Sequence, residues 1–380
     1  MPKLLFLVTE DWYFHSHRFG LARAAARSGY DVVLLTRVGA DRAAIEAAGI
    51  RVRALGWRRG RFSVWRELKA FVDICRVYRE EVPDLVHHVA LKPVIYGSLA
   101  LRFTKLARQT GSVNAIAGLG YSFISRGVRG WLLRYVMRMV LAWALRFSDC
   151  VLVQNPDDRE TVDSITPRDT KIRLIPGSGV DEQRFPYAPE PPEAPLVVTV
   201  VARMLWDKGI GEVVEASRVL REREPPLEFR LIGSADDANA ASIPAATLKQ
   251  WEREGLIIWM GHRDDIPSIW KESHIAVLPS YREGLPKSLL EAASSGRAMV
   301  TTDVPGCRDV VEHGVNGILV PVRDPSSLAA AIETLAADRG LRERLGNEAR
   351  RIVMERFTER AIVAATLVIY EELLGVASAR

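Results

Sequence analysis

The sequence has little of what secreted and membrane-spanning proteins depend on. Its three cysteines, Cys75, Cys150 and Cys307, lie far apart and match neither a disulfide framework nor a zinc site. No uncharged apolar run approaches the roughly 18 residues of a membrane-spanning helix. The first apolar run ends at Glu10 and Asp11, too early for a signal peptide. These absences predict a protein of the reducing cytoplasm.

Charge is unevenly distributed along the 380 residues. Residues 1–180 contain 28 Lys and Arg against 16 Asp and Glu, a net of +12, whereas residues 181–380 contain 24 against 31, a net of −7. A basic half suits an anionic partner, such as a lipid phosphate, a membrane surface or nucleic acid. Divergence between two related domains is the alternative explanation.

Short continuous apolar runs recur along the chain with helical patterns between them. Continuous rather than alternating apolar strands indicate parallel sheets that are covered on both faces. The chain is also long enough for two cores. We therefore predict an α/β fold of two doubly wound, Rossmann-like domains in tandem. The expected strands are 4–8, 31–36, 84–89, 113–116, 150–154, 172–175, 196–202, 228–232, 257–260, 275–278, 298–301 and 317–320.

Residues 186–195, PYAPEPPEAP, contain five prolines in ten residues and are typical of a semi-rigid linker. This linker would separate an N-terminal acceptor and membrane-side domain, residues 1–185, from a C-terminal nucleotide-sugar domain, residues 196–357. A final helix, residues 358–380, is expected to return to the first domain. Closure about the linker would exclude water from the cleft between the domains.

The segment 278–291, LPSYREGLPKSLLE, contains the strongest candidate site. A strand ends at its start, and a helix is expected with Pro286 at the first helical position. The N–H groups of Gly284 and Leu285 and of the first turn would face the carboxyl edge of the sheet, where an anion binds. Glu283 and Glu291 would flank this turn. A capping glutamate and a solvated helix face are the alternative for the two carboxylates.

The pair Glu283-x7-Glu291 with GLP between them resembles the signature of the large retaining glycosyltransferase family 4, which has the GT-B fold. The segments 202–209 (ARMLWDKG), 261–266 (GHRDDI) and 304–324 (VPGCRDVVEHGVNGILVPVRD) extend the resemblance to nearly the whole chain. The sequence is most similar to the bacterial branch that builds polyprenyl-diphosphate-linked glycans, such as its N-acetylgalactosaminyltransferases.

The resemblance implies a role for each matching residue. Arg203 and Lys208 would clamp the donor diphosphate and offset the charge of the leaving group, a task that other transferases give to a metal. Glu291 would bind the ribose hydroxyls, and Glu283 would bind hydroxyls of the transferred sugar. Ordinary surface charge is the alternative for the two cations.

Further donor contacts are implied for Gly284, Leu285 and Pro286, and the backbone of His262 and Arg263 would meet the base. The chain has no suitably placed metal-binding carboxylate pair, since its Asp doublets at 236–237 and 264–265 lie in polar loops. No metal or other cofactor is therefore expected.

The spacing of the two glutamates also argues against a glycosidase. Eight helical residues rise about 12 Å, whereas glycosidase carboxylates lie about 5–9.5 Å apart. The family implies retention by front-face displacement, in which the leaving diphosphate oxygen takes the acceptor proton. That course requires no side-chain base.

Acceptor contacts are expected in the N-terminal half. His15, His17 and Arg18 cluster in the loop after the first strand, at an expected helix start where an anion would be favoured. This loop has no glycine pair, unlike many family members, which favours an acceptor role over a donor-phosphate role. Each histidine could equally be a structural residue.

Three further acceptor candidates lie just beyond or within later strands. These candidates are Lys92, Asn114 and Gly118. In other family branches a histidine near the end of the strand at 113–116 contacts the donor sugar. Ala117 stands there in this chain, so that contact is missing or is made by Asn114.

Two basic, tryptophan-bearing stretches, 57–69 and 128–147, complete the N-terminal half. A basic amphipathic helix bearing Trp131, Arg134, Arg138 and Trp143 suits an anionic membrane surface. A core helix with an arginine-rich outer face is the alternative.

Together these patterns predict a metal-independent, retaining transferase. It would move a hexose or N-acetylhexosamine from a UDP-sugar to a polyprenyl-diphosphate-linked saccharide, on the inner face of the cell membrane, in surface glycan synthesis. A UDP-sugar 2-epimerase of the same fold, a transferase with a soluble acceptor and a non-catalytic sugar-nucleotide binder are the alternatives. A nucleic-acid-binding protein is disfavoured, because no helix-turn-helix, RRM or KH signature is present.

Overall fold

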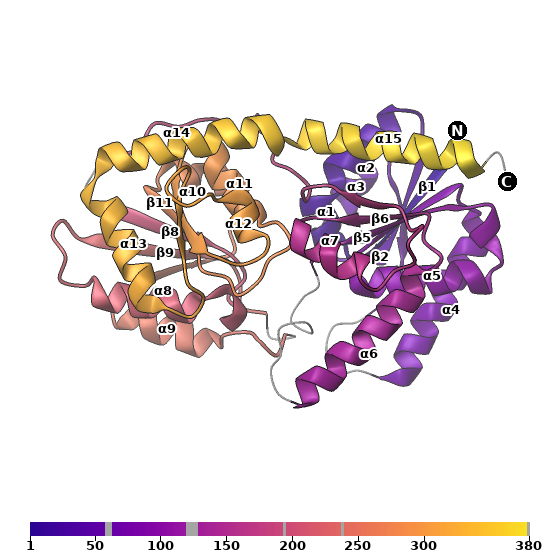
Figure 1. The fold of residues 1–380 in the computed structure, drawn as a ribbon, viewed down its shortest axis with the longest axis horizontal. Helices are drawn as coiled ribbons and strands as arrows, with labels where there is room; N and C mark the ends of the chain where they lie inside the picture. The colour runs from indigo at the N-terminus through magenta and orange to yellow at the C-terminus, as the bar shows by residue number, and fades with distance from the viewer. Residues whose placement is uncertain (58–62, 119–127, 193–194, 237–238, 378–380) are drawn as a thin grey trace. The chain divides into compact units, whose positions relative to one another are not determined.

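The computed structural model describes residues 1–57, 63–118, 128–192, 195–236 and 239–377, with the backbone alone for 128–134 and 376–377. The chain forms two compact units (Figure 1). Unit 1 consists of Met1–Ser178 and Arg360–Arg380, and unit 2 of Gly179–Glu359.

Unit 1 is built on a seven-stranded sheet in the order β3-β2-β1-β4-β5-β6-β7, in which every strand pair is parallel. Its strands are β1 Lys3–Glu10, β2 Asp31–Arg37, β3 Arg51–Ala54, β4 Leu85–Val89, β5 Gly111–Ile116, β6 Cys150–Val153 and β7 Ile172–Leu174. Its helices are α1 Asp11–His17, α2 Phe19–Arg27, α3 Arg42–Ala47, α4 Val64–Glu81, α5 Leu91–Phe103, η1 Leu106–Arg108, α6 Val128–Leu145, α7 Pro156–Asp163 and α15 Glu359–Ala377.

Unit 2 repeats this topology on a six-stranded parallel sheet in the order β10-β9-β8-β11-β12-β13. Its strands are β8 Leu196–Val201, β9 Leu227–Ile232, β10 Ile258–Gly261, β11 Ile275–Leu278, β12 Ala298–Thr302 and β13 Ile318–Val320. Its helices are η3 Trp206–Lys208, α8 Ile210–Val219, α9 Ala245–Arg253, α10 Ile266–Lys271, α11 Lys287–Ser294, α12 Cys307–Val310, α13 Pro325–Ala337 and α14 Arg339–Arg356.

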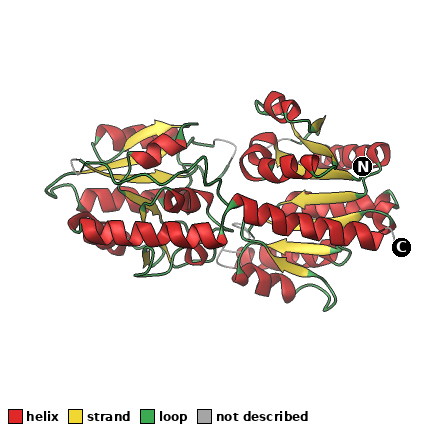
Figure 2. Cartoon of the chain, turned by 90° about the horizontal axis from the view of Figure 1, so that it is seen from above, coloured by secondary structure: helices red, strands yellow, loops and turns green. Residues whose placement is uncertain are grey.

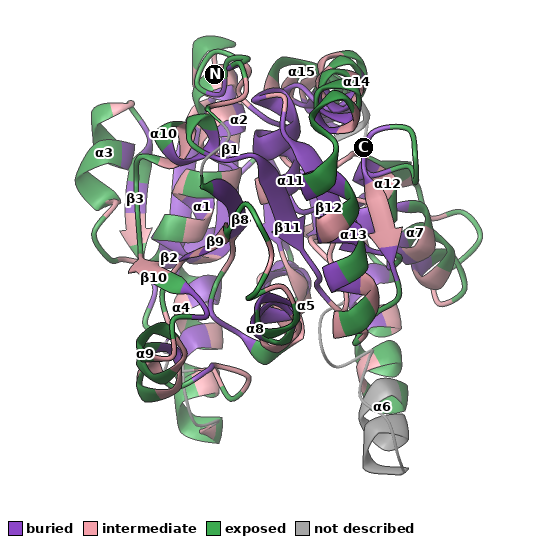
Figure 3. Cartoon of the chain, turned by 90° about the vertical axis from the view of Figure 1, so that its left-hand side faces the viewer, coloured by how far each residue is buried: buried purple, intermediate pink, exposed green. Residues whose placement is uncertain are grey.

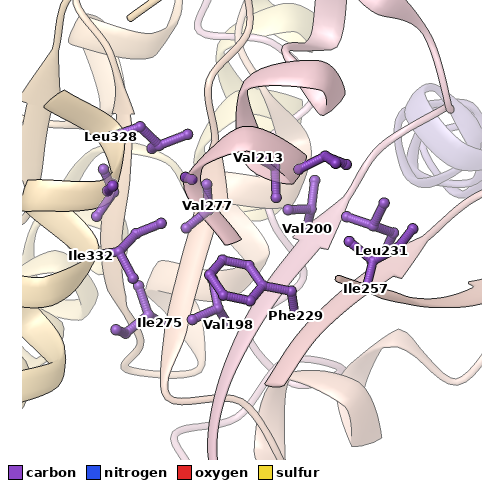
Figure 4. Packing of buried hydrophobic residues seen from close by; sticks show 14 of the residues in the cluster. Val198, Val200, Val213, Phe229, Leu231, Ile257, Ile275, Val277, Leu328 and Ile332 are labelled. Carbon is purple, nitrogen blue, oxygen red and sulfur yellow. The ribbon is translucent and has the colours of Figure 1, made fainter. Parts of the chain in front are cut away.

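In each unit the helices lie on both faces of the sheet (Figure 2). Successive side chains of a strand point to opposite faces, so a strand covered twice needs an apolar residue at every position. In β1, Leu4 and Phe6 join one core cluster, while Leu5 and Leu7 join the cluster on the other face. Buried residues accordingly follow the strands (Figure 3). Figure 4 shows the same packing in unit 2, where Phe229 lies beside Val198 and Ile332 lies beside Ile275.

The predicted fold class of two Rossmann-like parallel-sheet domains is confirmed. The sequence analysis missed β3, the short edge strand RVRA. Its alternating arginines, Arg51 and Arg53, form ion pairs with Glu81, which suits a half-exposed edge rather than a covered strand.

The proline-rich segment lies within unit 2 and does not separate the units, whose division falls at Ser178 and Gly179. Glu190 of this segment forms an ion pair with Arg342 of α14, which is only 2% exposed. Arg297 donates a hydrogen bond to the carbonyl of Ala188. A buried guanidinium requires such partners, so the segment is fixed to its own unit.

The C-terminal helix α15 belongs to unit 1. Its Tyr370 and Leu373 join the core cluster of β1 and β4, and the Tyr370 hydroxyl lies 2.5 Å from Nδ1 of the buried His87. Among the described residues, no helix is long and apolar enough to cross a bilayer.

Candidate functional site

The best-defined polar cluster lies at the carboxyl edge of the unit 2 sheet, beside β8 and β11. These two strands are neighbours at the point where the strand order reverses, which is where open α/β sheets bind ligands. The loop after β8 carries Lys208, and the loop after β11 carries Glu283. The topology therefore brings together two residues that are 75 positions apart in the sequence.

The two loops are held against each other through their backbones. The N–H group of Tyr281 donates a 2.9 Å hydrogen bond to the carbonyl of Asp207. Gly209 has a φ of +72°, and a Cβ atom there would lie 2.1 Å from the carbonyl oxygen of Pro279. Only glycine fits this contact and this backbone conformation. The position of Lys208 is therefore set by the close approach of its neighbour Gly209 to the loop after β11.

Lys208 and Glu283 form an ion pair, with Nζ 2.5 Å from Oε1. Both side chains are mostly buried, at 19% and 13% exposure. The hydroxyl of Ser280, which is fully buried, donates a 2.6 Å hydrogen bond to the same Oε1 atom. Exclusion of water strengthens these charge-assisted bonds. The ammonium and the carboxylate are thus presented together at the sheet edge.

A third loop, after β12, holds Glu283 from its other side. The N–H group of Glu283 donates to the carbonyl of Pro305, and a Cβ atom on Gly306 would lie 2.7 Å from the Glu283 backbone. The Thr302 hydroxyl donates to the carbonyl of Ser280. The VPG segment, residues 304–306, thus allows the loop after β12 to contact the loop after β11.

Glu291 lies on α11 and is 9% exposed. Burial raises the pKa of its carboxyl group above the ordinary value, although the charges of Lys287 and Arg184 oppose the rise. Lys287 Nζ is 3.9 Å from Oε1 of Glu291. Arg184 also donates a 3.5 Å hydrogen bond to the carbonyl of Asp264, in the loop after β10.

The other expected donor residues surround this cluster without joining it. Arg203 forms an ion pair with Asp236 at 3.2 Å, and in the described part of the chain nothing bonds it directly to Lys208 or Glu283. His262 and Arg263 follow β10 on the surface, where they pair with Asp264 and Asp265.

The GLP turn leads into α11 as expected, with one correction. The helix begins at Lys287 and Pro286 is the N-cap residue, with φ −72° and ψ 110°, so Pro286 is not the first helical residue. Its extended ψ places it outside the helix. Leu285 packs against the core beneath α11, and Gly284 lies beside Gly306, whose Cβ would be 2.8 Å from the Gly284 carbonyl oxygen.

In unit 1 the expected acceptor residues do not converge. His15 and His17 lie in the last turn of α1, which begins directly after β1, whereas Arg18 is the N-cap residue of α2 and so stands at a helix start as expected. His15 pairs with Asp41 at 3.1 Å. Arg18 is buried and donates to the carbonyl of Gly177 at 3.2 Å.

Lys92, Asn114 and Gly118 are likewise separate. Lys92 bonds Glu67 at 2.9 Å and lies 5.0 Å from the centre of the Trp57 ring. Asn114 is fully buried in a network with His88, described below. Gly118 has a φ of +98° and ends the described segment after β5.

Asn114 accepts a 2.6 Å hydrogen bond from Nδ1 of His88, whose Nε2 lies 2.8 Å from the Tyr78 hydroxyl. The Asn114 amide donates to Ser98 and Ser148. Burial lowers the pKa of His88 to about 4, so the ring is neutral. Both the oxygen and the nitrogen of the Asn114 amide are thus bonded inside the unit.

The helix α6 exposes an apolar stripe over its described side chains. Arg138 bonds Ser164, and Trp143 is 45% exposed beside Phe147. The side chains of Trp131 and Arg134 lie outside the described residues. The other exposed apolar residues on α6 are Tyr135, Val136, Met139 and Val140.

The sequence analysis missed three contributors to the site. Ser280 was read as part of the motif without a role, and Gly209 and Gly306 were quoted without one. A glycine in the loop after a strand is the signal that could have identified the last two, because it can mark a close backbone approach.

The fold and this cluster define a class, the glycosyltransferases of the GT-B fold. Residues 195–338 match the family described as glycosyl transferases group 1, and residues 3–155 match the family described as glycosyl transferase 4-like. The chain therefore consists of a glycosyl transferase 4-like domain followed by a glycosyl transferases group 1 domain, as its sequence motifs suggested.

The names of two relatives state that they act on lipid-linked sugars. The N,N'-diacetylbacillosaminyl-diphospho-undecaprenol alpha-1,3-N-acetylgalactosaminyltransferase of Campylobacter jejuni is 25% identical over 338 residues, 86% of this chain and 87% of the relative. The UDP-Gal:alpha-D-GlcNAc-diphosphoundecaprenol alpha-1,3-galactosyltransferase of Escherichia coli is 26% identical over 293 residues, 73% of each chain.

Among solved structures, the sucrose-phosphate synthase of Thermosynechococcus elongatus has the same fold. It superposes with a TM-score of 0.81 at 19% identity, over 99% of this chain and 100% of that one.

Proposed function

We propose that this glycosyltransferase moves a hexose or N-acetylhexosamine from a UDP-sugar to a polyprenyl-diphosphate-linked saccharide, with retention and without a metal ion. The observation that carries the proposal is the Lys208–Glu283 pair held between the loops after β8 and β11. A cation for the diphosphate and a carboxylate for sugar hydroxyls stand side by side there. The names of both relatives, which act on undecaprenyl-diphosphate-linked sugars, support the acceptor class.

In the proposed reaction, Lys208 stabilises the negative charge that grows on the departing diphosphate. The positive end of the α11 dipole acts in the same sense. Arg203 adds a second cation at the same sheet edge. Glu291 accepts hydrogen bonds from the ribose hydroxyls. The acceptor hydroxyl attacks the anomeric carbon from the same face that the diphosphate leaves. The departing diphosphate oxygen takes the proton of the acceptor hydroxyl.

Glu283 carries the proposed recognition of the transferred sugar. Its carboxylate accepts hydrogen bonds from sugar hydroxyls and steadies positive charge on the ring. Glu291 lies past the GLP turn and about one helical turn into α11, so the two carboxylates belong to different segments, which fits separate binding of sugar and ribose.

We also propose that unit 1 lies on an anionic membrane through α4 and α6. The packing supports this, because α5 packs against both of these helices (Figure 1). On α4 the exposed apolar residues include Trp65 and Leu68, and on α6 they include Met139 and Trp143. Apolar side chains beside Lys and Arg suit the boundary between headgroups and acyl chains.

Four measurements test the chemistry. Calorimetric titration with UDP- and GDP-sugars is expected to select a UDP-sugar, and UDP is expected to be released only when a polyprenyl-diphosphate-linked saccharide is added. NMR of the product should show the anomeric configuration of the donor, and EDTA should leave the rate unchanged. Inversion, or loss of activity in EDTA that Mg²⁺ restores, would overturn the corresponding part of the proposal.

Vesicle sedimentation tests the membrane part. The double variant Met139→Glu and Trp143→Glu should bind phosphatidylglycerol vesicles at least about tenfold less than wild type, because both changes place charge where apolar contact is expected. The matched control is Val219→Glu, at an exposed valine of unit 2, which should leave binding unchanged. Equal loss in both variants would contradict the proposed surface.

A further inference from the structure

Within the part of the chain that the structure describes, the Glu283 carboxylate is held through one of its two oxygens. Lys208 Nζ and Ser280 Oγ both bond Oε1, at 2.5 and 2.6 Å. Over the residues that the structure describes, no donor is bonded to Oε2. The two oxygens of this side chain therefore have different environments.

Ser280 is fixed well enough to cause this difference. It follows β11 directly, is fully buried, and its carbonyl accepts a hydrogen bond from the Thr302 hydroxyl. The Glu283 backbone is fixed separately by Pro305. Donor and acceptor thus start from two rigid points, so the Ser280 bond selects the rotation of the carboxylate.

Without that bond, Lys208 alone would hold the carboxylate. A single flexible ammonium has no preference between one oxygen and two, because it is a compact charge on a four-carbon stem. The carboxylate could then turn both oxygens toward Lys208. Oε2 would then no longer be left to accept a bond from another donor.

We propose that Ser280 is a positioning residue that holds Oε1 of Glu283 beside Lys208 and so leaves Oε2 to accept a hydroxyl of the transferred sugar. This inference rests on the proposed donor role of Glu283. Ser280 itself is fully buried and acts through Glu283, without touching the substrate.

The test compares two buried serines of unit 2. Ser280→Ala removes the bond to Glu283 and should lower kcat for transfer from the UDP-sugar about tenfold, the effect of losing a bond to a charged group. The calorimetric Kd for UDP should stay within about twofold of wild type. Ser294 is equally buried and donates a 2.6 Å bond to the carbonyl of Phe185. Ser294→Ala should lose similar thermal stability but keep its kcat.

A double-mutant cycle excludes a general structural effect. Ser280→Ala should cause no further loss of kcat in the Glu283→Ala background, because its action passes through that carboxylate. Ser280→Cys retains a weak donor of similar size and should give an intermediate kcat. If Ser280→Ala fails to fold, the kcat of Ser280→Cys takes its place in the test.

Wild-type kcat in folded Ser280→Ala, or an equal loss in both backgrounds, would overturn the positioning role alone. Wild-type kcat in Glu283→Ala would instead overturn the proposed function of the site.

Discussion

The polar residues of the two units behave differently. In unit 2, side chains from the loops after β8 and β11 meet in one ion pair, and a third loop supports it. In unit 1, the expected acceptor residues each bond a different neighbour, such as His15 with Asp41 and Lys92 with Glu67. The contrast teaches that a shared sheet edge alone does not create a site. Loops must also be built to touch, as Gly209 and Gly306 allow in unit 2.

The largest expected effect is at Glu283. Glu283→Ala should lower turnover by about 10²–10³-fold, on the scale of other preorganised electrostatic groups. Glu283→Gln should also lower turnover, yet it should bind UDP several-fold more tightly, because the diphosphate no longer shares Lys208 with a carboxylate. Steady-state kinetics and calorimetry measure the two quantities. Weaker UDP binding in Glu283→Gln would contradict the proposal that Glu283 and the diphosphate share Lys208.

Gly209→Ala tests whether loop contact makes the site. A Cβ atom would meet the Pro279 carbonyl, so the loop must shift and carry Lys208 with it. We expect a lower Tm and at least about tenfold weaker UDP binding. Gly255 has the same φ of +72° with nothing within 4 Å of its Cβ position. Gly255→Ala should therefore cost about 1 kcal/mol of backbone strain and leave UDP binding unchanged. Equal UDP binding in both variants would contradict the role of the contact.

Glu291→Gln sharpens the comparison through pH. Burial raises the pKa of Glu291, so the folded protein holds this proton more tightly than the unfolded chain does. Its ionisation therefore destabilises the fold as the pH rises above the ordinary value of 4.5. Glu291→Gln should raise the Tm at pH 8, and the gain should shrink as the pH falls toward 4.5.

The same variant should bind UDP about tenfold less tightly, because a neutral amide is a weaker acceptor for ribose hydroxyls than a carboxylate. Calorimetry and differential scanning measure the two effects. Glu348→Gln on the surface of α14 is the control and should leave UDP binding unchanged. A lower Tm at pH 8 in Glu291→Gln would show that the carboxylate is stabilised by partners.

The smallest effect on catalysis is expected at Asn114 in unit 1. Asn114→Ala removes the bonds that Asn114 makes with His88 Nδ1 and with the Ser98 and Ser148 hydroxyls, which costs about 1–3 kcal/mol of stability. The Tm should fall while the acceptor KM stays within about twofold. An unchanged Tm with a raised acceptor KM would instead support the acceptor role and remove the contrast between the units.

The sequence predicted the fold well, because strands covered on both faces must be apolar throughout. It failed at β3, whose arginines reflect a half-exposed edge. It placed a linker at residues 186–195 because proline composition suggests an extended spacer. The buried pairing of Glu190 with Arg342, 152 positions away, has no local signal.

The donor cluster was predictable from its motif, yet its internal pairing was not. The spacing of Glu283 and Glu291 says where each lies along the chain but not which cation each faces. Lys208 is joined to Glu283, whereas Arg203 is joined to Asp236. In unit 1, isolated histidines predicted little, because a polar residue after a strand can be bonded by a nearby residue of its own unit, as His15 is by Asp41.

The membership of α15 in unit 1 has a consequence for biosynthesis. Ile369, Tyr370 and Leu373 complete a core cluster whose other members lie before residue 153. Unit 2, by contrast, is fully encoded once residue 359 has been translated. The first unit to emerge from the ribosome therefore finishes folding last, with an open apolar face until the final helix is released. A nonsense mutation near residue 360 would leave that face uncovered in every copy, and such chains are expected to aggregate or be degraded even though the donor cluster is intact.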